Sequence, residues 1–387
     1  MRATGRWTGR AAALAAALGL WGCQPGAEPV EPVPAVGANQ IPIVGGLAEP
    51  GHPAVGALAQ VVGGRYNGPF CTATLIAPTW VLTAAHCLEG LRRSGQPAEP
   101  ANVVFVVGPD ARARDNAAPR DGVTHPVAAF HQHPGFIYGS VLQVDDLALY
   151  ALAEPVADVA PLPLWRQPME ALGPGTELLY VGYGANDGVR RTGTGLKRAR
   201  TLALTGVFPA HYLTDQPEGG TCYGDSGGPG LLLGDGPPAV VGVNSTVTGT
   251  TPAGAQCMEL SSQTRVDAYQ TWIDRVMGGD APCAEVPCAC DEACADGVCD
   301  PLGCDARGCR VLAECLSGCQ GAPACVLGCW DGSHRQGHGL YNAVIACGRL
   351  HCPQGGDACF NASCATEIAA CNGDYDPGPG GDAACSA

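Results

Sequence analysis

Short apolar runs recur between Ile43 and about Met277, and glycine, proline, asparagine or aspartate interrupts each of them. The runs are rich in branched residues and read TLIAPTWVLTAAH, NVVFVVG, DLALYAL, ELLYVGYG and AVVGVNS in chain order. Frequent short strands separated by turn residues are typical of antiparallel sandwiches and barrels rather than of alternating strands and helices. We therefore expect an all-β domain over this part of the chain.

The apolar pattern changes its period near the end of this region. In TRVDAYQTWIDRVMGG, which begins at Thr264, apolar residues recur at helical spacing and two glycines end the run. This pattern predicts an amphipathic helix that closes the domain.

The overall composition indicates a folded chain and argues against one class of partner. The 387 residues are long enough for two domains, and 46% of them are hydrophobic, which is enough for a full-size core. The formal net charge is -15, and the only lysine is Lys197. Because phosphate binding relies on clustered lysine and arginine, we expect no nucleic-acid partner.

The first 42 residues have features of export. Arginines precede an apolar run from Ala11 to Trp21, and a run this short predicts a signal peptide over residues 1–22 rather than a membrane-spanning helix. Cys23 follows in a stretch that resembles a bacterial lipobox, so it is a candidate for lipidation and for a membrane tether. The alternative is cleavage a few residues later, with Cys23 discarded. Residues 23–42 are rich in proline and predict a linker or a short pro-segment.

Beyond residue 279 the chain becomes rich in cysteine. Of the 22 cysteines, 17 lie after residue 282, a density at which covalent links replace an apolar core. Cys315 with Cys319, and Cys325 with Cys329, are four residues apart, which places each pair on one face of a helix. We expect a small disulfide-rich module over residues 280–387 with short stapled helical hairpins, and zinc is the competing use of the clustered cysteines.

The stretch TCYGDSGGPG surrounds Ser226 with glycine and places an acid beside it. A serine hydroxyl is a weak nucleophile until a base takes its proton, and a histidine base needs an acid to orient it. His86 ends the apolar stretch VLTAAHC, where Cys71 could bond Cys87 and fix the turn. Asp146, in VDDLALY, comes just before an apolar run, as a buried acid requires. These residues are candidates for a nucleophile, its base and the orienting acid.

Four motifs in this order resemble those of the chymotrypsin-like serine peptidases. They are IVGG from Ile43, TAAHC around His86, DLAL from Asp146 and GDSGGP around Ser226. The resemblance covers residues 43 to about 277 and implies two six-stranded antiparallel β-barrels, with the active site in the cleft between them. We place the peptidase domain at residues 43–279.

The resemblance also implies a role for each matched residue. His86 would act as general base and then as general acid, Asp146 would hold its tautomer, and Ser226 would attack the substrate carbonyl. The backbone N–H groups of Gly224 and Ser226 would form the oxyanion hole. Ser245 resembles the family serine that bonds the buried acid.

Asp225 is implied to take part in activation. In the family, the acid before the serine pairs with the α-ammonium that is created by cleavage before the isoleucine of IVGG, here Ile43. A carboxylate that is buried without a partner charge costs several kcal/mol of stability. We therefore expect a zymogen, in which cleavage before Ile43 supplies that charge. Residue 42 is proline, however, and no lysine or arginine lies between Arg10 and Ile43. Either a peptidase of another specificity cuts this bond, or the chain never becomes fully active.

The implied specificity pocket lacks a charge. Gly220 stands where trypsin-type members carry an aspartate for arginine or lysine substrates, so such substrates would find no partner. Val247, just beyond Ser245, stands where a glycine would leave the pocket open. A disulfide between Cys222 and Cys257 would brace this pocket. We expect a narrowed apolar pocket for small or medium aliphatic residues at P1, the substrate residue before the cut bond.

Taken together, these features predict an exported serine endopeptidase that lies outside the cytoplasm, secreted or on the cell surface, and acts on proteins or peptides. The alternative is a catalytically silent surface binding protein on a peptidase scaffold. The role of the cysteine-rich module stays open between stabilisation and binding of a surface or substrate, and its pattern resembles repeats of myxobacterial surface proteins. His131 and His133 form an H-x-H pair that could bind a metal, but a structural role is favoured, and we expect no metal and no cofactor.

Overall fold

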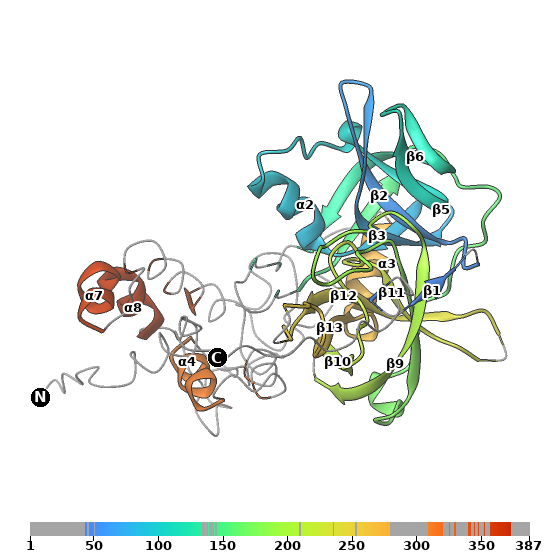
Figure 1. Ribbon diagram of the computed structural model, residues 1–387. Helices are drawn as coiled ribbons and strands as arrows, with labels where there is room; N and C mark the ends of the chain where they lie inside the picture. Colours follow the sequence, from blue (N-terminus) through green and yellow to red (C-terminus); the bar gives the residue numbers. More distant parts are fainter. Residues whose placement is uncertain are drawn as a thin grey trace, which may run out of the picture. The chain divides into compact units, whose positions relative to one another are not determined.

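The computed structural model describes most of the chain from Ile43 to Gly278 and part of the C-terminal region (Figure 1). The described residues are 43–44, 46–49, 51–133, 136, 138, 143, 145–208, 210–234, 236–251, 254–278, 309–319, 325, 329, 340–341, 344, 347, 352 and 357–372. The predicted signal peptide, the proline-rich segment and Cys23 lie outside them. The chain divides into two compact units, one with most of residues 40–287 and one with most of the cysteine-rich region.

Six antiparallel strands form the first barrel, in the order β2-β3-β4-β7-β6-β5, and it closes because β2 pairs with β5. Large buried side chains pair on both faces of this sheet, because consecutive residues of a strand point to opposite sides. Leu82 lies opposite Leu149 and Val81 opposite Tyr150, and each of the four is at most 1% exposed. The strands are β2 (Val55–Val62), β3 (Arg65–Ala77), β4 (Trp80–Thr83), β5 (Val103–Arg114), β6 (Ala118–Gln132) and β7 (Ala148–Leu152).

The second barrel also closes, because β8 pairs with both β9 and β11. Its order is β8-β9-β10-β13-β12-β11, and the short strand β1 (Leu47–Ala48) adds to the free side of β9. The strands are β8 (Glu177–Gly182), β9 (Arg198–Val207), β10 (His211–Asp215), β11 (Pro229–Leu232), β12 (Ala239–Val247) and β13 (Leu260–Arg265). The predicted pair of six-stranded antiparallel barrels is therefore confirmed.

One buried apolar cluster includes residues of both barrels. Leu75 and Val81 of the first barrel belong to the same cluster as Leu231 and Val243 of the second. Because this cluster is continuous, burial of its apolar surface stabilises the two barrels against one another. The loops between strands can then place side chains from both barrels at one site.

Helical segments within this unit are short. The closing helix, predicted from Thr264, begins at Gln270, because Thr264 and Arg265 are used by β13 to pair with Val243 and Gly242 of β12. The segments are α2 (Ala85–Arg93), η1 (Pro100–Asn102), η2 (Met169–Ala171), η3 (Asp267–Tyr269) and α3 (Gln270–Gly278), of which the η elements are single 3-10 turns.

The cysteine-rich unit has short helices joined by disulfides, as predicted. Its helices are α4 (Cys309–Gly318), α7 (Asp357–Ser363) and α8 (Ala365–Asn372). Cys315 bonds Cys329 and Cys319 bonds Cys325, so the two pairs spaced by four residues are cross-linked to each other. The further disulfides join Cys309 to Cys371, Cys347 to Cys364 and Cys352 to Cys359. Covalent links thus replace an extended core.

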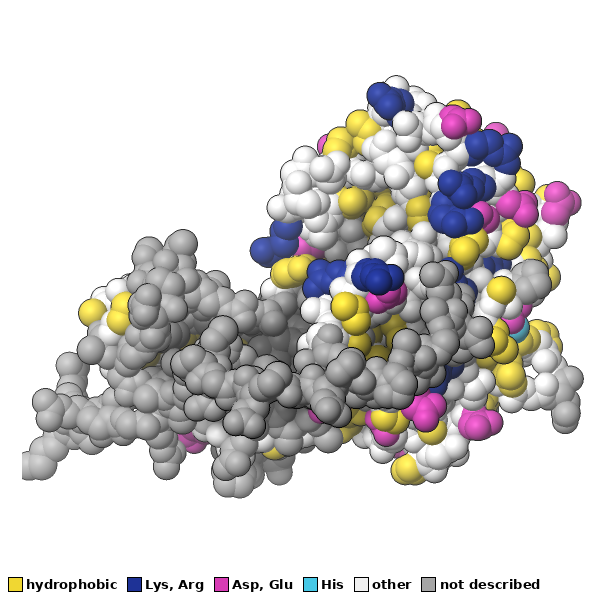
Figure 2. Space-filling model, in the orientation of Figure 1, with side chains coloured by type: hydrophobic (Ala, Val, Ile, Leu, Met, Phe, Trp, Pro, Cys, Tyr) yellow, Lys and Arg dark blue, Asp and Glu magenta, His cyan; other side chains and the backbone are white. Residues whose placement is uncertain are grey.

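The surface and helix lengths give two further observations. On the face of the described residues seen in Figure 2, basic side chains lie in small groups with acidic ones close by. None of the helices in the part of the chain that the structure describes is long and apolar enough to cross a membrane.

Candidate active site

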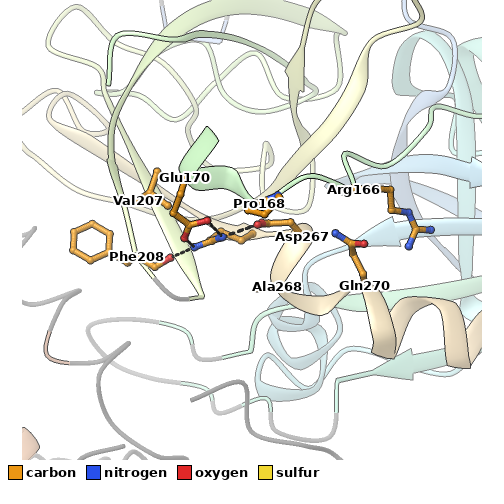
Figure 3. Close-up of a pocket in the computed structure, with 9 residues that line it drawn as sticks. Arg166, Pro168, Glu170, Val207, Phe208, Asp267, Ala268 and Gln270 are labelled. Carbon is orange, nitrogen blue, oxygen red and sulfur yellow. Dashed lines mark hydrogen bonds and ion pairs between the residues drawn. The ribbon is translucent and has the colours of Figure 1, made fainter. Parts of the chain in front are cut away.

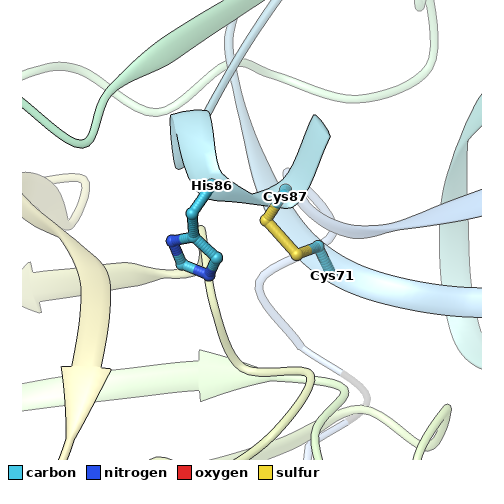
Figure 4. Close-up of side chains that lie close together, drawn as sticks. All are labelled: Cys71, His86 and Cys87. Atoms are coloured by element: carbon cyan, nitrogen blue, oxygen red, sulfur yellow. A yellow bond between two sulfur atoms is a disulfide. The ribbon is translucent and has the colours of Figure 1, made fainter. Parts of the chain in front are cut away.

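His86 lies in the first turn of α2, just after β4 ends at Thr83. A disulfide joins Cys87 to Cys71 on β3, with the Cα atoms 6.1 Å apart, and ties the start of α2 to the barrel (Figure 4). The His86 side chain keeps 17% of its surface exposed, so solvent reaches it. Ligand atoms of Cys71, His86 and Cys87 lie within 4.8 Å of one another, but both sulfurs are in the disulfide and are not thiolate ligands.

Asp146 lies just before β7 and is fully buried. Its Oδ2 lies 2.6 Å from His86 Nδ1 and accepts a hydrogen bond of 2.6 Å from the Ser245 hydroxyl. Its Oδ1 accepts a bond of 2.8 Å from the backbone N–H of His86. Burial alone would raise the pKa of Asp146, but the nearby His86 and these hydrogen bonds outweigh it and lower the pKa. The carboxylate is therefore ionised and fixed toward the ring.

The same pair sets the state of the imidazole. Because an ionised carboxylate can only accept, His86 Nδ1 carries the proton and Nε2 of the neutral ring is left as a base. Burial lowers the pKa of His86, while the charge of Asp146 and their hydrogen bond raise it, and the net effect is an increase above 6.5. The ring is therefore a stronger base than an ordinary histidine.

The adjacent acid, Asp145, has a different partner. Its Oδ1 accepts a hydrogen bond of 2.6 Å from the Tyr269 hydroxyl, and Asp145 has a φ of 48°. Two consecutive acids are thus directed to different partners, and Asp146 is the one that faces His86.

The loop that carries Ser226 packs against the turn that carries His86. The Ser226 carbonyl accepts a bond of 2.8 Å from the N–H of Thr72 and lies 3.7 Å from the Cys87 sulfur. Gly227, with a φ of 81°, has no room for a side chain, because a Cβ there would overlap Thr83 and Thr72. Among the described residues, no hydrogen bond joins the Ser226 hydroxyl to His86, and catalytic bonds of this kind are often long before substrate binds.

Two backbone donors next to the serine are available. Within the described residues, the N–H groups of Gly224 and Ser226 have no hydrogen-bond acceptor. Gly224 has a φ of 98°, and its carbonyl accepts a bond of 2.8 Å from the Thr72 hydroxyl. Free amides held by a fixed loop can stabilise a developing oxyanion.

Asp225 is buried, with 1% of its surface exposed. Its carboxylate accepts bonds from the N–H groups of Gly184, at 2.7 Å, and Cys222, at 2.9 Å. Burial raises its pKa to about 7, and these bonds and the charge of Arg198 limit the rise. Ile43 is fully buried, but among the described residues it makes no hydrogen bond or ion pair with Asp225.

A family model described as trypsin matches residues 43–273, which is more than half of the chain. The chain belongs to the trypsin family. Its members are serine peptidases, and therefore hydrolases. The match covers both barrels and includes His86, Asp146 and Ser226.

Individual relatives show the same domain. Pig (Sus scrofa) coagulation factor XII is 33% identical over 217 residues, which are 48% of this chain but only 32% of that protein. A fibrinolytic enzyme, isozyme C, of Lumbricus rubellus is 29% identical over 224 residues, or 52% of this chain and 86% of the relative. Rat (Rattus norvegicus) granzyme M is 26% identical over 257 residues, or 58% and 92%. This trypsin-family chain thus spans about a third of factor XII and most of the two smaller proteins.

Near Gly220, the trypsin-family scaffold carries an uncharged polar network that the sequence did not reveal. Gln216 Nε2 donates to the carbonyls of Thr221, at 3.0 Å, and Cys257, at 2.9 Å. The Thr221 hydroxyl lies 2.7 Å from that of Ser261 and donates to Gln216 Oε1 at 3.3 Å. A Cβ at Gly220 would meet Gln216 Oε1 at 2.5 Å, so Gln216 leaves no room there for an aspartate. The disulfide between Cys222 and Cys257 adjoins this network.

Two further residues, Thr72 and Arg198, contribute to the site although the sequence did not indicate them. Thr72 links the two barrels, because its hydroxyl contacts Gly224 and accepts a bond of 3.1 Å from the N–H of Tyr183. The positive charge of Arg198 lowers the pKa of Asp225 without a direct contact. Neither residue lies in a motif, and a single threonine or arginine in a strand carries no signal of long-range contact. His133, half of the H-x-H pair, is 2% exposed and packs edge-on against Tyr269 and Trp272.

A separate surface hollow of about 490 Å³ lies over Arg265, next to η2 and η3 (Figure 3). The Arg265 guanidinium donates to Glu170, at 2.6 Å, and to Asp267, at 2.5 Å. Its charge is therefore already paired, and Arg166, which also lines the hollow, is paired with Asp274 at 2.6 Å.

Proposed function

We propose that this protein is a serine endopeptidase that forms an acyl-enzyme on Ser226. The observation that carries the proposal is the His86–Asp146 pair, since the Ser226 loop packs against the same turn. Nε2 of the neutral ring is then the base for the serine proton.

The proposed reaction uses one proton relay twice. The Ser226 hydroxyl gives its proton to His86 Nε2 as Oγ bonds to the substrate carbonyl carbon, and Asp146 stabilises the imidazolium. His86 then gives that proton to the departing amine as the C–N bond breaks. Water next gives a proton to His86 as its oxygen bonds to the acyl carbon, and His86 returns that proton to Ser226 Oγ as the ester bond breaks and the acid leaves. The N–H groups of Gly224 and Ser226 donate hydrogen bonds to the negatively charged carbonyl oxygen, and the loss of one such donor costs about 3 kcal/mol.

Hydrolysis of an unfolded protein substrate tests the proposal. We expect Ser226→Ala to lower kcat by about 10⁶-fold without loss of folding, because the nucleophile is removed. Ser317→Ala, at a half-buried serine in the cysteine-rich unit, is the matched control and should leave kcat unchanged. Chains that never cleave any substrate, even with Ile43 as the N-terminus, would instead favour a silent binding protein.

For activation, we propose that cleavage before Ile43 creates an α-ammonium that pairs with Asp225. A positive charge there would lower the pKa of Asp225 from about 7 and hold the carboxylate ionised. Pro42 makes a trypsin-like activator unsuitable, so the activator has another specificity. N-terminal sequencing of the purified protein identifies the cut, and a protein in which no chain begins at Ile43 would exclude this step.

For specificity, we propose small or medium P1 residues without a charge. Gly220 and Val247 support this proposal from the sequence, and the uncharged network of Gln216, Thr221 and Ser261 gives a cation no partner. A P1 peptide library should show preference for small residues, and replacement of Thr221 and Ser261 by glycine should admit larger ones. A strong preference for arginine would overturn the proposal.

For location, we propose export by the signal peptide at residues 1–22, since disulfides form outside the reducing cytosol. Lipidation of Cys23 would tether the chain to a membrane, and the cysteine-rich module would bind a surface or substrate. The family model ends at residue 273, so the resemblance of that module to myxobacterial repeats stays a prediction. The mass of the N-terminal peptide of the mature protein distinguishes a lipidated Cys23 from later cleavage.

A further inference from the structure

Arg198, the first residue of β9, is a buried cation that the proposed reaction does not use. Only 3% of its surface is exposed. One guanidinium nitrogen donates to the carbonyls of Gly193, at 2.6 Å, Leu196, at 3.1 Å, and Gly184, at 3.4 Å. Arg198 Nε is buried and, among the described residues, has no hydrogen-bond partner. The guanidinium is therefore held by carbonyl dipoles on one side.

No carboxylate lies within 4 Å of Arg198 in the part of the chain that the structure describes, so it has no direct ion pair. Burial lowers its pKa to about 10, and the acids that oppose this are Asp225 and, less strongly, Asp110, while Arg112 adds to the lowering. A buried cation without a contacting anion is costly unless a nearby negative charge compensates it. Asp225 is the strongest such charge.

Gly184 connects the two buried charges. Its N–H donates to Asp225 Oδ1, and its carbonyl accepts from Arg198. Gly182 and Gly184 also lack room for side chains, because a Cβ at either would overlap the Asp225 carboxylate. The cation and the carboxylate thus both bond the backbone of one glycine of the loop after β8, and the charge of Arg198 lowers the pKa of Asp225 without a direct contact.

We propose that Arg198 is a built-in counter-charge that lets Asp225 ionise in the uncut chain at mildly basic pH, so that the oxyanion site is assembled and the peptidase is active before any cleavage. This inference rests on the proposed function. An ionised Asp225 accepts from both Gly184 and Cys222, and these bonds hold the Cys222–Ser226 segment in shape. A protonated Asp225 would lose one acceptor, and the donors at Gly224 and Ser226 would loosen with it.

The N-terminal sequence supports a counter-charge that the uncut chain itself supplies. With Pro42 before Ile43 and no basic residue back to Arg10, the chain lacks the signal for a trypsin-like activator. A chain that supplies its own cation does not depend on such a cut. Arg198 is therefore a positioning residue, and it acts on Ser226 through Asp225.

The test compares uncut and cut full-length chains. Pro42→Lys introduces a site for a lysine-specific peptidase, and the chain's single lysine, Lys197, is 3% exposed and protected. The rate of labelling by a fluorophosphonate probe is measured at about pH 8, where the carboxyl of Asp225 in the uncut chain is mostly ionised. It is measured before and after the cut, with Arg198 present and with Arg198→Gln. Arg265→Gln is the matched control, since it removes another buried guanidinium of the same barrel, one paired with Glu170 and Asp267.

We expect the uncut chain with Arg198 to be labelled within about tenfold of its cut form, because the loss of even one oxyanion donor costs about 100-fold or more. Uncut Arg198→Gln should be labelled about 100-fold more slowly, and cutting should restore the rate, since the α-ammonium replaces the lost charge. Arg198→Lys should keep uncut labelling. Arg265→Gln should leave the ratio of uncut to cut rates unchanged, even if the chain unfolds at a lower temperature.

Several results would overturn the inference. One is an uncut native chain that is inert until cut, which leaves the peptidase proposal intact. Another is an uncut Arg198→Gln chain that is labelled as fast as the native one, or one that folds but is not restored by cutting. If Arg198→Gln does not fold, a folded Arg198→Lys chain without uncut labelling also contradicts it. A native chain that is inert in both forms contradicts the peptidase function itself.

Discussion

The charge of Asp146 controls the base strength of His86. Asp146→Asn removes that charge and one acceptor, so we expect kcat to fall by roughly 10⁴-fold. Asp146 raises the pKa of His86, so its loss should lower that pKa. Since the neutral ring is the active form, the acid limb of the kcat/KM profile should move to lower pH. Asp145→Asn, next to it but bonded to Tyr269, is the control and should leave that limb in place. An unmoved limb in Asp146→Asn would contradict the assignment.

Asp225 gives the uncut chain an unusual dependence of stability on pH. Its pKa of about 7 in the folded state lies above the ordinary value of 3.8, so the folded state binds the proton more tightly. The stability from this group is full below pH 4 and is lost as the pH rises through 7, by up to about 4 kcal/mol. Asp225→Asn should remove this fall, which thermal unfolding between pH 4 and 8 measures. Equal slopes for the two proteins would show that Asp225 does not titrate in this range.

At the scale of elements, the contact between the Ser226 loop and the end of β4 aligns the two barrels. Gly227→Ala would force a Cβ into Thr83 and Thr72 at a φ of 81°, so we expect a loss of activity of about 100-fold or more from displaced oxyanion donors. Gly234→Ala, where nothing lies within 4 Å, is the control and should change kcat/KM little. Wild-type activity in Gly227→Ala would show that this contact does not position the serine.

The sequence predicted the secondary-structure elements better than it predicted the contacts between distant segments. Short apolar runs separated by turn residues predicted an all-β domain, and the resemblance of four motifs to a known family implied the two six-stranded barrels. The predicted helix begins too early because Thr264 and Arg265, which precede its first apolar residue, pair with β12 as the end of β13. Motifs located His86, Asp146 and Ser226. The network of Gln216 and the counter-charge at Arg198 depend on contacts between distant segments, and no local pattern encodes those.

At the scale of the whole molecule, the peptidase unit has a complete core of its own. Both barrels close and α3 ends at Gly278, so the unit does not need the later cysteines to bury its apolar surface. A chain that ends at residue 279 should therefore keep its kcat/KM on small peptides, while any binding to surfaces is lost with the module. Loss of folding in the shortened chain, seen by circular dichroism, would show that the module stabilises the peptidase unit.

His86 activates the Ser226 hydroxyl by taking its proton. Mass spectrometry of the protein after fluorophosphonate treatment tests it most directly, because the probe bonds only to an activated serine. We expect a single adduct, on the peptide that contains Ser226, and its disappearance in His86→Ala. An adduct on another serine, or an adduct on Ser226 that forms equally fast in His86→Ala, would contradict it.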